Sequence, residues 1–379
     1  MIAAANWPYL PGSTLRISVD GFDPPYGTAV LGNGGIDGGM LHIFDDASAG
    51  DAFVVAGNTV GLAARTLHVA VPPNGKRTLL AVASYDDGIA LHDAVSFAPL
   101  GLFGTGGAPT DVAIDPRNRI VATDTQGSTL SLAGIAPWAP SRVDGVPLGD
   151  ELAIDSATGA IFVTNRDVDG SGALTRVASD GTVTRVATGL TAEGLAVDAR
   201  RGVVYVANVN DGTVAVVDAV TMRVVRRFPA VSRVFSLALS ADGTRLFAVS
   251  NQSTGSPFAA PGCVVAIALD AAVPHVVARS AKLTFPIGIA LDPSTAKLFV
   301  TDEEDDSIYV LDAHTLRPRG APLPTCRTPW KPTIDAQRLY VACARADAID
   351  AYDLHSLRRV PGAPFATAGY PLAVAVWHP

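Results

Sequence analysis

Acidic and amide side chains recur at the points where apolar, strand-like runs begin or turn. Asp111, Glu151 and Glu193 stand at the start of such runs. Asn165 and Asn208 end the runs "IFVTN" and "VYVAN", just before short polar loops. Carboxylate and amide oxygens are the ligands that a hard cation such as calcium prefers, in sets of about six to eight. If the fold brings these residues together, they form a candidate metal site.

A second calcium candidate lies within one loop, the run "NRDVDGSG" at 165–172. Its alternating oxygens and its glycine follow the spacing of a calcium-binding loop. Such a loop ends on a bidentate acid, but Arg176 stands at that place. The run therefore predicts either a weak calcium loop with Asp167 and Asp169 as ligands, or a plain glycine-rich hairpin.

Two basic residues and two aromatic residues stand at similar places. His68 and Lys331 are expected to pair with the carboxylates, because like charges confined together raise one another's pKa. Apolar contact surface is expected from aromatic residues beside them and from the Pro- and Gly-rich loop at 251–262. The predicted ligand-binding residues are His68, Asp111, Glu151, Glu193, Phe235, Trp330 and Lys331.

A sequence repeat indicates which elements would hold these residues. The segments "GVVYVANVNDGTVAVVD" at 202–218 and "KLFVTDEEDDSIYVLD" at 297–312 are two copies of one hairpin pattern, each preceded by a short apolar strand. A period of about 40 to 45 residues with four strands per unit is typical of a β-propeller. The strand starts recur with this period, apart from one longer spacing, at His68, Asp111, Glu151, Gly194, Ser236, Gly288, Lys331 and Ala373.

These starts predict an all-β propeller of eight four-stranded blades, or of seven if the N-terminal part forms an irregular cap. The segment 370–379 reads as an inner strand with no hairpin after it, whereas the strands expected at 27–33, 40–45 and 52–55 lack an inner strand. We therefore expect 370–379 to close the ring by joining the N-terminal blade. The chain would form one propeller domain over 1–379, with 1–25 as an N-terminal extension.

A propeller would also explain how distant residues meet. The loop before each inner strand and the hairpin between the second and third strands open on the same face, so the candidate residues converge at the mouth of the central channel.

The segments "LFVTDEEDDSIYVLDAHT" and "VYVANVNDGTVAVVDAVT" resemble the YVTN-type β-propeller repeat, which is related in fold to lactonases and gluconolactonase-like proteins. The resemblance implies a divalent metal in the channel that polarises a lactone carbonyl or activates water, with a neighbouring Asp as base. The metal ligands would be Asp111, Glu151, Glu193 and Asn208.

Three functions remain open at this point. The leading expectation is a binding module whose acidic channel mouth holds a small ligand, a cation or a partner segment. The alternatives are a metal-dependent hydrolase or lyase of a lactone-like molecule, and a structural scaffold in which Asp and Asn only form turns. Calcium or another divalent cation is the cofactor expected, if any.

Composition narrows the classes of partner. A net charge of −8 argues against a nucleic-acid surface, which needs clustered Lys and Arg. No apolar run is long enough to span a bilayer. The sequence contains no G-x-S-x-G, G-x-x-x-x-G-K-[ST] or H-E-x-x-H motif. The location expected is periplasmic or secreted if an export signal has been removed, and cytoplasmic otherwise.

The chain has three cysteines, Cys263, Cys326 and Cys343, so they cannot all pair with one another. Cys326 and Cys343 fall in one repeat unit. We expect them to be buried free thiols, with a bridge between them as the alternative.

Overall fold

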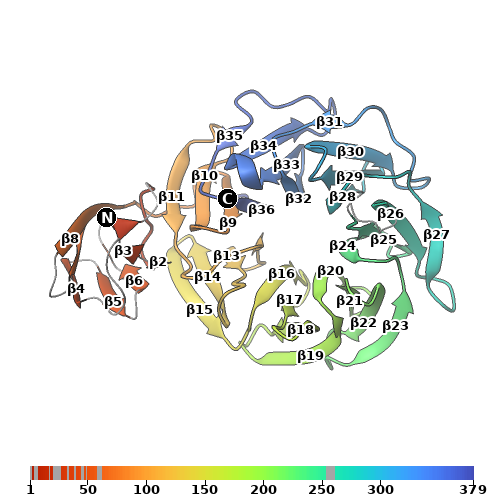
Figure 1. Ribbon diagram of the computed structural model, residues 1–379, viewed down its shortest axis with the longest axis horizontal. Helices are drawn as coiled ribbons and strands as arrows, with labels where there is room; N and C mark the ends of the chain where they lie inside the picture. Colours follow the sequence, from red (N-terminus) through yellow and green to blue (C-terminus); the bar gives the residue numbers. More distant parts are fainter. Residues whose placement is uncertain are drawn as a thin grey trace.

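The computed structural model describes residues 2–3, 7–16, 18–19, 27–31, 34–37, 40–43, 47, 49–57, 62–252 and 261–379. Within these residues, seven four-stranded antiparallel sheets follow one another around a ring, and the small sheets of the N-terminal part lie outside it (Figure 1). The fold is therefore an all-β propeller of seven blades. The described residues contain one helical turn, η1 (Ala344–Ala346), and no helix long and apolar enough to span a bilayer.

Each blade runs from an inner strand at the channel to an outer strand at the rim (Figure 1). In this order, blades 1 to 3 are β36 (Pro371–Trp377), β9 (Leu79–Ser84), β10 (Gly88–Asp93) and β11 (Pro99–Phe103); β12 (Val112–Ile114), β13 (Arg119–Ala122), β14 (Thr129–Ile135) and β15 (Trp138–Asp144); and β16 (Gly149–Ile154), β17 (Ile161–Arg166), β18 (Ser171–Val177) and β19 (Val183–Leu190). Blades 4 and 5 are β20 (Ala192–Asp198), β21 (Val203–Asn208), β22 (Thr213–Asp218) and β23 (Val224–Pro229); and β24 (Val234–Leu239), β25 (Arg245–Ser250), β26 (Cys263–Ala268) and β27 (His275–Arg279). Blades 6 and 7 are β28 (Pro286–Asp292), β29 (Lys297–Asp302), β30 (Ser307–Asp312) and β31 (Leu323–Pro324); and β32 (Pro329–Asp335), β33 (Arg338–Cys343), β34 (Ala348–Asp353) and β35 (Phe365–Ala366).

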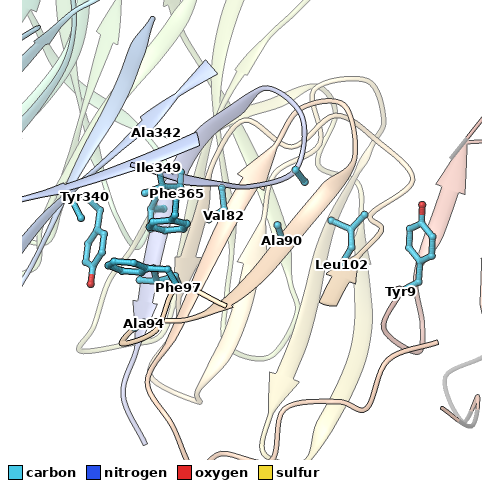
Figure 2. Packing of buried hydrophobic residues seen from close by; sticks show 14 of the residues in the cluster. Tyr9, Val82, Ala90, Ala94, Phe97, Leu102, Tyr340, Ala342, Ile349 and Phe365 are labelled. Carbon is cyan, nitrogen blue, oxygen red and sulfur yellow. The ribbon is translucent and has the colours of Figure 1, made fainter. Parts of the chain in front are cut away.

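The sequence of each strand matches its place in a blade. The second and third strands, such as β21 and β22, are almost continuous runs of Val, Ala and Tyr because both of their faces are covered by neighbouring blades. The outer strand β23 carries exposed Arg226 and Arg227. Seven clusters of buried apolar side chains lie between successive blades in the described part of the chain. Figure 2 shows the cluster between blades 7 and 1, in which Phe97 stacks on Phe365.

The ring closes through its C-terminal strand. β36 pairs with β9, so the end of the chain supplies the inner strand of the first blade, as predicted for 370–379. The prediction of eight blades is wrong, and the alternative of seven holds. The strands that β36 completes are β9, β10 and β11 within 79–103, not the strands expected at 27–33, 40–45 and 52–55.

Those earlier segments do form strands, but in small separate sheets. β1 (Ile2–Ala3) pairs with β3 (Ser18–Val19), β6 (Met40–Ile43) lies between β2 (Thr14–Arg16) and β5 (Gly34–Asp37), and β7 (Gly50–Gly57) lies between β4 (Gly27–Leu31) and β8 (Leu62–Val69).

The N-terminal sheets are joined to the ring at the rim of blade 1. Tyr9 forms parallel bridges to Val69 on one side and to Leu102 of β11 on the other. Its backbone N–H donates to the carbonyl of His68 at 2.7 Å. Tyr9 therefore links the edge of blade 1 to the sheet that contains β8, and its buried ring lies beyond Leu102 in Figure 2.

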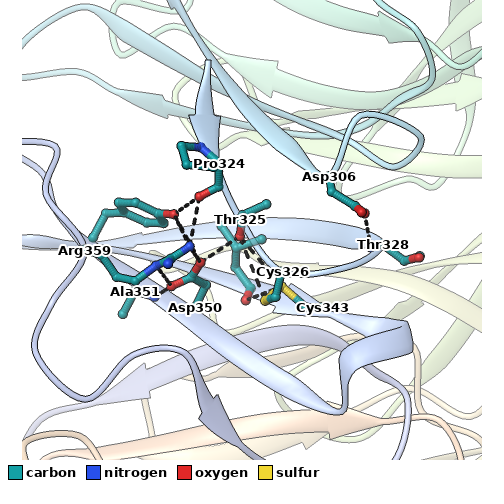
Figure 3. The surroundings of a disulfide bond; sticks show 11 residues. Asp306, Pro324, Thr325, Cys326, Thr328, Cys343, Asp350, Ala351 and Arg359 are labelled. Carbon is teal, nitrogen blue, oxygen red and sulfur yellow. Dashed lines mark hydrogen bonds and ion pairs between the residues drawn. A yellow bond between two sulfur atoms is a disulfide. The ribbon is translucent and has the colours of Figure 1, made fainter. Parts of the chain in front are cut away.

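A disulfide joins Cys326, just before β32, to Cys343 at the end of β33, with the Cα atoms 5.7 Å apart. The expectation of two free thiols there is wrong; the third cysteine, Cys263, is buried and free. Beside the disulfide, the buried carboxylate of Asp350 accepts two hydrogen bonds from Arg359 and one from Thr325 (Figure 3). Blade 7 is thus held by covalent and ionic contacts as well as by its strands.

Candidate functional site

Most inner strands begin with an irregularity of the same kind. The pairing register between the inner strand and the adjacent strand shifts within the first residues of the inner strand. This shift occurs in β16, β20, β24, β28, β32 and β36. A β-bulge of this kind places two residues opposite one and turns side chains away from the regular alternation. The shifted residues include Asp150, Glu151, Glu193, Trp330 and Lys331. The repeated bulge thus places charged and aromatic side chains at the starts of the inner strands, at the channel mouth.

The first group of charges joins three blades. Lys331 of β32 in blade 7 places its Nζ atom 2.5 Å from Oδ2 of Asp111 and 3.8 Å from Oε2 of Glu151. The same oxygen of Asp111 accepts a hydrogen bond from the backbone N–H of Leu152 at 2.9 Å. Asp111 precedes β12 in blade 2, so its buried carboxylate bridges blades 2 and 3 and also meets the cation from blade 7. The pairing predicted for Lys331 is present.

The second group lies beside the first. Arg166, at the end of β17, places Nε 3.1 Å from Oδ2 of Asp150 and Nη1 3.0 Å from Oε1 of Glu193. Asp150 and Glu193 are almost completely buried. Arg166 therefore links a buried carboxylate of blade 3 to a buried carboxylate of blade 4.

The cluster, defined as Asp111, Asp150, Glu151, Glu193, Arg166 and Lys331, contains four carboxylates and two cations. Burial raises the pKa of Glu151 to about 7; Asp111 and Asp150 add to the rise, and Lys331 opposes it. Burial and the neighbouring Asp150 also raise the pKa of Glu193 well above its ordinary value, against the effect of Arg166. The acidic side chains thus outnumber the basic ones, and two carboxyl groups hold their protons more tightly than usual.

The pKa values of the two cations of the cluster are also raised. Burial lowers the pKa of Lys331, but Asp111 and Glu151 outweigh this effect and leave that pKa above its ordinary value. The pKa of Arg166 is likewise raised, because Asp150 and Glu193 outweigh the effect of burial. Both cations therefore stay charged across the whole physiological range.

Aromatic pairs lie on two sides of the cluster. The ring of Phe235, from the start of β24, meets that of Trp330 edge to face, with centroids 6.4 Å apart. Trp330 directly precedes Lys331, and its buried indole Nε1 has no hydrogen-bond partner. Tyr85 and Tyr370 form a similar pair at 6.2 Å in blade 1. The structure thus brings the two predicted aromatic residues together.

A cavity of about 310 Å³ begins at Asp111 and Lys331 and continues along the inner strands. It is lined on β12, β16, β32 and β36, chiefly by aliphatic side chains. These are Val112, Ala113, Ile114, Leu152, Ile334, Val374, Ala375 and Val376. The charged mouth therefore opens onto an apolar section of the channel.

The asparagines predicted as metal ligands lie inside their hairpins. Asn165 is buried, donates to the carbonyl of Pro147 at 2.7 Å and accepts from Thr175 at 2.6 Å. Asn208 is also buried and donates to the carbonyl of Thr188 at 3.3 Å. Their amide groups contact backbone and threonine groups of blades 3 and 4.

The residues of the second calcium candidate bind protein groups within their own blade. Asp167 accepts from Arg185 at 2.6 Å, and Asp169 accepts from the hydroxyl of Ser171 at 2.6 Å. Across the described ranges, no three His, Cys, Asp or Glu side chains come together in an arrangement that could hold a metal ion. In the channel, the places between the carboxylates are taken by Lys331 and Arg166.

Two predicted features lie elsewhere. His68 does not begin an inner strand; it is exposed and lies in β8 of the N-terminal sheets, paired in register with Asp51 of β7. Its assignment to the channel is wrong because the first blade begins at β9. Most of the predicted apolar loop at 251–262, residues 253–260, lies outside the described residues.

Arg166 is the residue of the cluster that the sequence interpretation did not identify. It stands between Asn165 and Asp167, which were both considered as oxygen ligands. The alternation of side chains along β17 carries the missing signal, because the residue after Asn165 points to the opposite face of the blade. Asp150, Tyr85 and Tyr370 were also not among the predicted ligand-binding residues.

Known proteins resemble this chain in fold. No protein-family model matches the sequence, and no curated protein matches it significantly. Among solved structures, a functionally unknown protein from Desulfotomaculum acetoxidans DSM 771 has a TM-score of 0.65 and 13% identity, covering 80% of this chain and 100% of its own. A protein from Bacteroides uniformis ATCC 8492 described as a putative 6-phosphogluconolactonase has a TM-score of 0.64 and 12% identity, covering 79% and 99%. Sqt1 from Saccharomyces cerevisiae has a TM-score of 0.57 and 14% identity, covering 79% and 84%.

These similarities concern the fold. The neighbours include proteins described as putative lactonases and a protein that carries no enzyme name, so they show the fold and not an activity. Function has to be argued from the channel mouth.

Proposed function

We propose that this protein is a binding propeller that holds a small ligand with a cationic group in its channel mouth. The observation that carries the proposal is the excess of carboxylates in the cluster: four acidic side chains from blades 2, 3 and 4 surround only two cations. A third positive charge would reduce the repulsion that burial and the neighbouring acids impose on Glu151 and Glu193.

The geometry favours a cationic ligand over an anionic one. Lys331 and Arg166 are each already engaged with two carboxylates, so neither is free to neutralise an added anion. An ammonium group, by contrast, would add a hydrogen-bond donor to a cluster in which acidic side chains outnumber basic ones. The edge-to-face pair of Phe235 and Trp330 adds aromatic surface beside the cluster.

The test is calorimetric titration with n-butylammonium chloride, using sodium chloride at equal ionic strength as the reference. We expect saturable binding to the intact protein and a loss of at least about tenfold in affinity for the double variant Asp150→Asn and Glu193→Gln, since each removes a charged acceptor. Asp270→Asn, which changes an exposed carboxylate in blade 5, should bind as the parent does. If butylammonium gives no more heat than sodium, the proposal fails.

A second candidate is a hydrolase or lyase of a lactone-like molecule, with a divalent cation such as calcium as the expected cofactor. The observation in its favour is that burial raises the pKa of Glu151 to about 7, near Lys331 of the cavity wall, which suits proton transfer at neutral pH. Metal analysis of the purified protein and thermal unfolding with calcium chloride or EDTA separate the candidates. A melting temperature that rises with calcium and falls with EDTA would favour the metal-dependent enzyme; one that neither reagent changes favours the binding module.

A further inference from the structure

The cavity below the mouth begins at the charged cluster. Asp111 and Lys331, which belong to the cluster, are also among the residues that line the cavity of about 310 Å³. A ligand whose charged group lies at the carboxylates would therefore have the rest of its structure directed into this space.

Eight of the twelve residues that line the cavity have aliphatic side chains. Ile114, Ile334 and Val376 are each only partly buried although they lie on inner strands, and all three line the cavity. No aromatic side chain is among the lining residues. An aliphatic chain can pack against these side chains, whereas a flat ring would find no aromatic side chain to stack on.

Polar groups on the wall are already engaged. The hydroxyl of Thr333 donates to the carbonyl of Val374 at 2.8 Å. Asp335 lies 2.8 Å from Nε2 of His378. The cavity has the volume of about ten water molecules, which limits the ligand to a small molecule.

We infer that the ligand is a small amphipathic cation: an ammonium head among the carboxylates of the cluster and a linear aliphatic tail of a few carbons between β12, β32 and β36. This inference rests on the proposed function, because it takes the cationic head from it. It adds the chemical class of the remainder of the molecule and where that remainder lies.

The inference predicts a dependence of affinity on chain length. Burying one methylene group is worth about fourfold in affinity, from about 0.8 kcal/mol per group. Methyl-, propyl-, butyl- and hexylammonium should therefore bind the intact protein with progressively higher affinity until the cavity is filled. The matched alcohols should bind much more weakly, because they lack the charge that the carboxylates select.

A pair of variants locates the tail. Val376→Thr keeps the shape of a partly buried cavity residue but adds a hydroxyl, so it should weaken hexylammonium by about fourfold and leave methylammonium unchanged. Val225→Thr makes the same change at a side chain of β23 that is 60% exposed on the rim, and it should change neither. Circular dichroism melts of both variants establish that the ring is intact, and the chain-length series on the unmodified protein needs no variant.

The outcomes separate the two claims. Equal affinity for all four amines would overturn the aliphatic tail while leaving the cationic site in place. Alcohols that bind as well as the amines, or amines that do not bind at all, would overturn the proposed function itself. A rise with chain length that Val376→Thr reduces and Val225→Thr does not supports both.

Discussion

Replacing Glu151 by Gln should stabilise the protein at alkaline pH and not at acid pH. Its pKa rises from 4.5 in the unfolded chain to about 7 in the ring, chiefly through burial. Between these two values the folded protein binds more protons than the unfolded chain, so stability falls as pH rises. At pH 8 the whole penalty applies, and at 1.36 kcal/mol per pKa unit it is on the order of 3 kcal/mol. Gln removes the charge, so the penalty disappears.

Urea unfolding at pH 4.0 and pH 8.0, followed by tryptophan fluorescence and circular dichroism, measures the effect. The variant should gain about 2 to 3 kcal/mol over the parent at pH 8.0 and stay close to it at pH 4.0, because about a fifth of the Glu151 side chain stays exposed and solvent reduces the full value. Asp270→Asn, at an exposed position, is the matched control. A variant that is destabilised at pH 8.0, or that shifts equally at both pH values, would refute the reasoning. The prediction also bears on function, since an acid retained at a cost in stability is typical of a site.

Three further predictions concern the ring and its mouth. Deleting residues 371–379 removes β36 with the buried side chains of Leu372, Val374 and Trp377, and the burial of each stabilises the fold by about 1.5 to 3 kcal/mol. The deletion should therefore abolish cooperative thermal unfolding. A melt close to that of the intact chain would count against closure through this strand. Replacing Cys326 and Cys343 by Ala opens a loop with a sequence separation of 17 and should destabilise the protein by about 3 kcal/mol in urea, whereas an unchanged midpoint would show that the bridge does not contribute. Butylammonium should bind more tightly at pH 8 than at pH 5.5, because a bound cation favours ionised Glu151. Calorimetry in two buffers of different ionisation enthalpy should detect the proton that is released. An affinity that does not depend on pH would show that Glu151 is not part of the binding site.

Much of the fold could be predicted because the same strand pattern recurs along the sequence once in each blade. The period identified seven inner strands correctly, from Asp111 onward, and the unpaired run at 370–379 indicated closure. The extra blade arose because the N-terminal strands β4, β6 and β7 have the same alternation as blade strands, and local pattern cannot say which partner a strand will find. Similarly, the spacing of Cys326 and Cys343 gave no measure of the distance between them.

The site was predictable only in part. Asp111, Glu151, Glu193 and Lys331 were identified because each stands at a strand start, and the ring brings such positions together. Which of their charges pair depends on the bulges, and those appear only in the three-dimensional register. Arg166 was not identified because it meets Asp150 on the adjacent strand of blade 3 and Glu193 in blade 4, and no local spacing reveals either contact.

Acidic residues at the other ends of the strands have a different role, and the sequence indicated it. Asp218, for example, accepts hydrogen bonds from the backbone N–H groups of Val220 and Thr221 and so forms the turn after β22. The same side chain type is thus structural on one face of the ring and gathered into a charged cluster on the other.

A crystal structure of the protein with n-butylammonium tests the central claim most directly. The account predicts the ammonium nitrogen within hydrogen-bond distance of carboxylate oxygens of the cluster, with the butyl chain between β12 and β36 in the cavity that Ile114 and Val376 line. A channel mouth without the amine at saturating concentration, and with Lys331 and Arg166 in their present contacts, would contradict it.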